Sequence, residues 1–173
     1  MLSALCFSAH SPLLFALSPV TSSLDDATVA YVIASQPLFE DLRQVAAQLA
    51  GLLVLAATGS REATPAHPML EAAERLFKRT ADGIAHVRPG ERARLHHDSL
   101  REAVRSIGDA LTATRGLLPA TNAADLDAVL VPLRAGYSHL QRAAGALPGF
   151  RMVAFEQGCC AGGHATQSPG VIA

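Results

Sequence analysis

Apolar residues recur every three or four positions through most of the chain, which predicts amphipathic α-helices. This pattern, with the Pro, Gly and capping residues that interrupt it, predicts five helices, at about residues 24–35, 36–58, 68–87, 90–117 and 122–147. The last has the most regular apolar stripe, formed by Leu126, Val129, Leu133, Tyr137, Leu140, Ala144 and Leu147. Pro132 is expected to kink this helix.

Pro37 is expected either to kink one long helix or to begin a new one, because proline breaks a hydrogen bond in a helix interior, and we favour a new start. Ser23 and Asp26 fit a capping box at the start of the first helix, and Ser35 is the expected cap of the second. The last two turns of the second helix are apolar on all faces, which predicts the most buried element of the fold.

The third and fourth helices show charged faces beside their apolar stripes. Pro68 suits the first turn of the third helix, where Glu71–Arg75 and Glu74–Lys78 are spaced as ion pairs. In the fourth helix, His96 lies one turn before Leu100 on the apolar face. We therefore expect His96 at the edge of the core.

These elements predict an all-α fold: an antiparallel bundle of four long helices plus a short N-terminal helix. Residues 1–23 are expected to form an N-terminal arm and residues 24–149 the bundle domain. Residues 150–173 are expected to form an irregular Gly- and Cys-containing tail that packs on the bundle.

Composition agrees with a helical protein and narrows its function. Half of the 173 residues are hydrophobic, only 5% are aromatic, and the net charge is -1, which argues against a general nucleic-acid binder. The longest apolar stretch, residues 45–58, is too short to cross a membrane. The first basic residue is Arg43, so a secretory signal is not expected. The absence of an expected signal and the odd number of cysteines, three, favour a reducing cytoplasm.

The tail contains the most unusual group of reactive side chains, Cys159, Cys160 and His164. Thiolate and imidazole groups bind zinc and copper, so one hypothesis is a metal site. Its fourth ligand would come from the bundle, with His96, His97 and His139 as candidates. The alternatives are a redox-active or nucleophilic thiol, and simple packing of small residues. We favour packing and expect no cofactor.

A second hypothesis concerns His139. The segment 138–144 (SHLQRAA) resembles the phosphorylated helix of histidine phosphotransfer domains, in which a basic residue follows the histidine three positions later. Arg142 occupies that position, whereas Ala143 stands where the family has glycine. The acidic cluster usual around such histidines is missing. The resemblance implies that His139 is a phosphoacceptor.

Basic residues are concentrated in residues 75–115, with nine Lys or Arg against five Asp or Glu. Arg88, Arg92 and Arg94 lie near a helix N-terminus and are candidates for an anion site. The interleaved acidic residues favour the simpler interpretation, a solvated face with ion pairs.

Motifs of common enzymes are absent: there is no phosphate-binding Gly-rich loop, no dinucleotide fingerprint and no nucleophile elbow. We therefore predict a non-enzymatic cytosolic binding, adaptor or regulatory protein with an unidentified protein or small-molecule partner. Surplus apolar surface predicts a homodimer. The alternatives are the metal or thiol protein and the phosphotransfer module.

Overall fold

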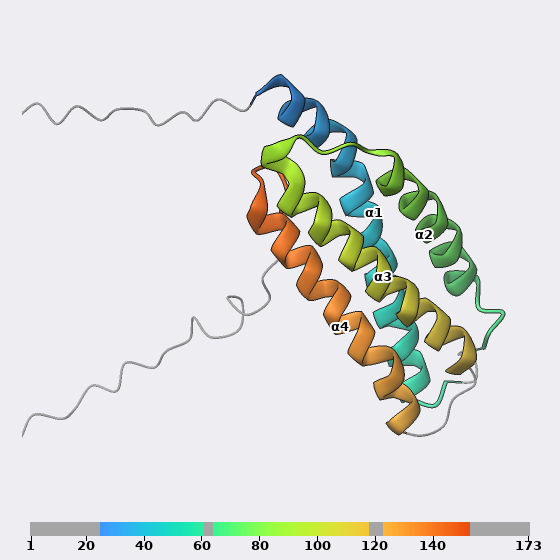
Figure 1. The fold of residues 1–173 in the computed structure, drawn as a ribbon. Coiled ribbons are helices and arrows are strands. Elements are labelled where there is room, and N and C mark those ends of the chain that lie inside the picture. The colour runs from blue at the N-terminus through green and yellow to red at the C-terminus, as the bar shows by residue number, and fades with distance from the viewer. Residues whose placement is uncertain (1–24, 61–63, 118–122, 153–173) are drawn as a thin grey trace, which may run out of the picture.

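The computed structural model describes residues 25–60, 64–117 and 123–152, and these residues form an all-α protein (Figure 1). Its helices are α1 (Asp26–Ala57), α2 (Pro68–His86), α3 (Arg94–Leu117) and α4 (Ala123–Ala146), with a short 3-10 helix η1 (Glu91–Ala93) before α3. No β-strand occurs in these three segments. The all-α prediction is confirmed. No helix within the described ranges has both the length and the apolar character needed to span a bilayer.

α1 is one continuous helix, so the predicted break at Pro37 is wrong. Pro37 removes the hydrogen bond to the carbonyl of Ile33, one turn earlier. Both residues are exposed, so water can solvate that carbonyl. Ser35 does not cap a new helix: its hydroxyl donates to the carbonyl of Tyr31 at 2.7 Å. The predicted short N-terminal helix is therefore the first part of α1.

The cap of α1 also differs from the predicted Ser23–Asp26 box. Asp25 is the N-cap, and its Oδ1 accepts a hydrogen bond from the backbone N–H of Thr28 at 2.7 Å. This bond and a second one from the Thr28 hydroxyl lower the pKa of Asp25. A carboxylate also suits the positive end of the helix dipole.

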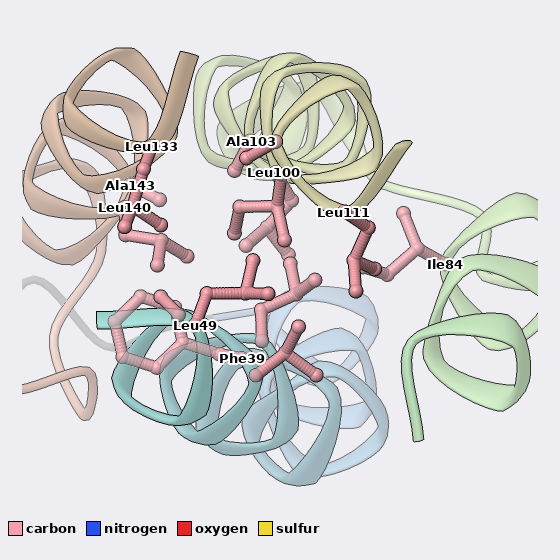
Figure 2. Close-up of a cluster of buried hydrophobic side chains, with 14 of the residues drawn as sticks. Phe39, Leu49, Ile84, Leu100, Ala103, Leu111, Leu133, Leu140 and Ala143 are labelled. Carbon is pink, nitrogen blue, oxygen red and sulfur yellow. The ribbon is translucent and has the colours of Figure 1, made fainter. Parts of the chain in front are cut away.

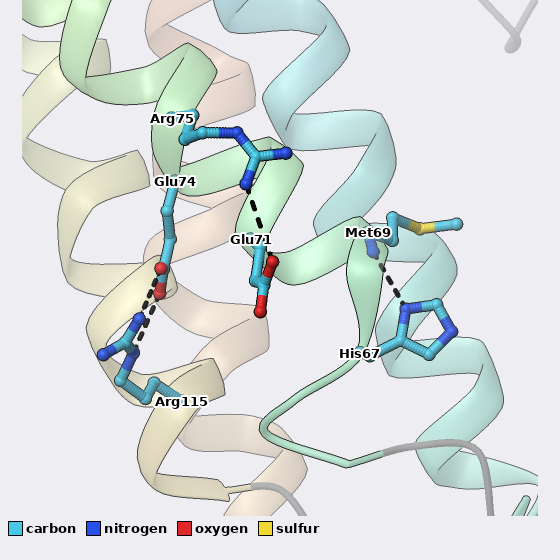
Figure 3. Close-up of polar contacts among 6 residues, drawn as sticks. All are labelled: His67, Met69, Glu71, Glu74, Arg75 and Arg115. Carbon is cyan, nitrogen blue, oxygen red and sulfur yellow. Dashed lines mark hydrogen bonds and ion pairs between the residues drawn. The ribbon is translucent and has the colours of Figure 1, made fainter.

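α2 begins at Pro68 as predicted, and His67 caps it by accepting a hydrogen bond from Met69 N at 3.1 Å (Figure 3). Glu71 and Arg75 form the predicted ion pair at 3.6 Å. Glu74 does not pair with Lys78. Instead, both of its carboxylate oxygens accept hydrogen bonds from Arg115, which joins α2 to α3.

The core lies between the helices and is built mainly from leucine and alanine (Figure 2). Phe39 and Leu49 from α1 and Leu100 from α3 are almost completely buried. Ile84 of α2 joins the same cluster from the side. Val129, Leu133, Leu140 and Leu147 of the predicted α4 stripe are buried, which confirms that stripe as the inner face.

Among the described helices, α3 and α4 make the most extensive contact. Gly136 on α4 allows this approach: a Cβ placed there would lie only 2.7 Å from Cγ1 of Ile107 on α3. Ala103 and Ala110 on α3 and Ala143 on α4 are also fully buried. Small side chains therefore bring the two backbones together.

We predict that Gly136→Ala lowers the free energy of unfolding by about 1–3 kcal/mol, because the added methyl group overpacks the contact with Ile107. Gly145→Ala on the same helix is the matched control, since a Cβ there has no neighbour within 4 Å. It should stabilise the protein by up to about 1 kcal/mol through helix propensity. Urea denaturation measures both, and equal effects would contradict the close approach.

Candidate functional site

A groove of about 960 Å³ runs between α1 and α4. α1 contributes Glu40, Asp41, Arg43, Gln44, Ala46, Ala47 and Ala50, and α4 contributes Leu133, Arg134, Tyr137, Ser138 and Gln141. Met152, which follows α4, completes the lining. Its size is near the upper end of the range for small-molecule sites in proteins.

The groove exists because small side chains line α1 where it faces α4. Ala46, Ala47 and Ala50 project only a methyl group, so they leave space that longer side chains would fill. Ala47 and Ala50 are exposed although they belong to the most apolar part of the chain. Burial in this part of α1 is confined to its inner face: Leu49 and Leu52 are buried, whereas Val54 is 62% exposed.

The charges in the groove are unequally compensated. Glu40 and Arg43 form an ion pair at 2.5 Å, and Asp41 accepts a hydrogen bond from the hydroxyl of Thr80 on α2 at 3.3 Å. Within the described segments, no ion pair involves the exposed guanidinium of Arg134. The groove thus combines small apolar side chains with one carboxylate, Asp41, and one guanidinium, Arg134, that have no ion pair among the described residues.

A second feature is an aromatic cluster around His96, which is completely buried. His96 Nδ1 is hydrogen-bonded to the hydroxyl of Tyr31 at 2.7 Å. The ring of Phe150 lies 4.0 Å from the His96 ring and 5.3 Å from that of Phe39. His96 Nε2 is buried and has no hydrogen-bond partner among the described residues.

Burial controls ionisation in this cluster. It lowers the pKa of His96 to about 4, with a further contribution from neighbouring His97, and it raises the pKa of Tyr31 to about 12. The pKa of His97 is also lowered, by burial and then by Arg101. At neutral pH His96 is therefore a neutral group held between aromatic rings.

The structure describes only part of the predicted metal site. His96 and His97 are neighbours near the start of α3, but no group of three or more His, Cys, Asp or Glu residues within the described ranges is arranged to hold a metal. Cys159, Cys160 and His164 lie outside those ranges, as do most of the predicted tail and the whole predicted arm. The metal and thiol hypotheses stay predictions.

The other candidates also stay predictions. His139 is half-buried on α4, with Nδ1 buried and without a partner among the described residues. Arg88, Arg92 and Arg94 are exposed, and Arg92 lies 3.9 Å from the cap residue Asp25. The anion site would therefore compete with this contact at Arg92.

Sequence reasoning missed Tyr31, Phe150 and the groove. Phe150 falls outside the helical periodicity, and nothing in the sequence pairs Tyr31 with a histidine 65 positions later. The sequence did contain a signal for the groove. Part of α1 is apolar on all faces, and the core can cover only some of these faces, so apolar side chains remain at the surface.

Comparison with known proteins assigns no relative to this chain. No protein-family model, curated protein or solved structure matches it.

We predict that stability falls as pH drops from about 7.5 to about 5. The pKa of His96 is lower in the folded protein (about 4) than in the unfolded chain (6.5), so acid protonates the unfolded chain first. His96 should contribute on the order of 2 kcal/mol to this loss. Urea denaturation at both pH values should show a smaller loss for His96→Gln.

The control for this prediction is His86→Gln, because His86 is exposed at the end of α2. This variant should keep the pH dependence of the unmodified protein. An unchanged pH dependence in His96→Gln would show that protonation of His96 does not limit stability.

Proposed function

We propose that this chain is a non-enzymatic cytosolic binding protein of an adaptor or regulatory kind, built as an antiparallel helical bundle. Its binding site is the groove between α1 and α4. The observation that carries the proposal is the groove itself, because its volume, apolar lining and polar side chains are typical of ligand sites.

The chemistry of the lining supports binding of an amphipathic partner. Leu133, Met152 and the α1 alanines offer apolar contact, whereas Gln44, Ser138 and Gln141 offer hydrogen-bonding groups. A partner buried here removes apolar surface from water, which contributes about 25 cal/mol per Å². Polar groups at the same site orient the partner.

The test uses Nile red, a neutral apolar dye whose fluorescence rises in apolar sites. We expect saturable binding to the full chain. Ala47→Trp should weaken it at least about tenfold, a loss of about 1.4 kcal/mol, because the indole ring fills the groove. Ala85→Trp is the control, since Ala85 is an exposed residue of α2 outside the groove. Equal binding to both variants would overturn the proposal.

Self-association is a second part of the proposal and is supported by exposed apolar side chains. Val29 and Ile33 lie one turn apart on α1 and are 40% and 69% exposed, and Leu95 on α3 is 65% exposed. The contact between Tyr31 and His96 brings these two helix segments to the same end of the bundle. Isologous pairing of this surface would give a homodimer.

Sedimentation velocity over a range of concentrations tests the dimer. Ile33→Lys and Leu95→Lys should each raise the dimer dissociation constant at least about tenfold, because they place a charge in an apolar interface. Val54→Lys, at the other end of α1, is the control and should have little effect. A strictly monomeric unmodified protein at high concentration would contradict self-association.

A further inference from the structure

We propose that the ligand of the α1–α4 groove is a free organic acid with an extended apolar body, and that Arg134 binds its carboxylate. This inference rests on the proposed function and specifies the class of ligand. It is argued from the shape of the groove, the compensation of its charges and the side chains next to Arg134.

The shape of the groove suits a narrow, extended molecule. Glu40 and Ala50 both line it, and ten helical residues at 1.5 Å each give a length of about 15 Å. An α-helix with its side chains is about 10–12 Å in diameter, so only about three turns of a partner helix would fit within about 960 Å³. A flexible apolar chain fills the same space without needing that width.

The apolar floor matches the body of such a ligand. Ala46, Ala47 and Leu133 lie on the two facing helices, and Met152 contributes a flexible thioether side chain. Methionine adapts to ligands of irregular shape because it is unbranched and polarisable. These side chains therefore favour a ligand with an apolar body of suitable size, without requiring a particular hydrogen-bonding pattern.

The ion pairing of the groove side chains favours a ligand with a single negative charge. Arg43 is paired with Glu40, which leaves Arg134 as the cation of the groove without an ion pair among the described residues. Asp41 keeps its negative charge and accepts a hydrogen bond from Thr80 on α2. The planar guanidinium matches a carboxylate with two parallel hydrogen bonds. A phosphate dianion fits less well, because Arg134 offers one positive charge and the carboxylate of Asp41 would repel the second negative charge.

Residues next to Arg134 complete the polar end. Ser138 and Gln141 follow it at spacings of four and seven residues, so they lie on the same face of α4, and both line the groove. The Ser138 hydroxyl donates to the Arg134 carbonyl at 3.0 Å, so the Gln141 amide is the better candidate for a further donor to the carboxylate. The ligand would lie with its acid group on α4 and its apolar body along the α1 alanines.

The experiment compares decanoate with 1-decanol, two probes that differ in the carboxylate. Each displaces Nile red from the full chain near neutral pH. We expect decanoate to bind at least about fivefold more tightly than 1-decanol, and added salt to reduce this preference. Arg134→Gln should remove the preference by weakening decanoate alone. Arg142→Gln, an exposed α4 arginine outside the groove, should keep it.

The outcomes separate this inference from the proposed function. Nile red binding with no preference for decanoate, or a preference that survives Arg134→Gln, overturns the acid ligand and leaves the groove as a binding site. Absence of any groove binding overturns both. Dissociation of a dimer by Ala47→Trp would assign the groove to a second copy, with the same consequence.

Discussion

The arrangement of the bundle depends on the close approach of α3 and α4 at Gly136 and Ile107. Once these helices are in contact, α1 fills the hollow beside them with Phe39, Leu42 and Leu49. α1 approaches α3 and α4 to a similar extent, but it presents Ala46, Ala47 and Ala50 to the space beside α4. These small side chains leave the groove open, so the candidate site lies directly beside the core.

Helix periodicity predicted most of the fold because it reports burial directly. The α4 stripe followed from spacing alone, whereas His96, which was expected at the edge of the core, is completely buried. The error at Pro37 came from treating proline as a local signal, whereas an unpaired carbonyl on the solvent side costs less than breaking a helix that packs along its length. The N-cap of α1 was predicted at the wrong residue for a related reason. Asp25 and Ser23 are both suitable cap residues, and only the surrounding structure selects one of them.

The candidate site was harder to predict because it depends on pairs of residues distant in sequence. Composition directs attention to the basic residues of 75–115, yet the groove cation without an ion pair in the described segments is Arg134, which lies outside that stretch. Arg134 differs from Arg43 in having no ionic partner in the described part of the chain. Which side chains become partners depends on the tertiary structure, so the sequence alone does not show it. Glu74 illustrates the same limit, because its partner Arg115 lies 41 positions away and displaced the local pair with Lys78.

Phe150 also has a consequence for the layout of the chain. Its ring packs on His96, and the carbonyl of Gly149 accepts a hydrogen bond from the Gln36 side chain at 3.5 Å. Asp25, the first described residue, lies near Arg92 just before α3. The two ends of the bundle domain thus meet on one side, which is the geometry that tolerates circular permutation and insertion into a host protein. The folded unit is therefore suited to being carried as a module.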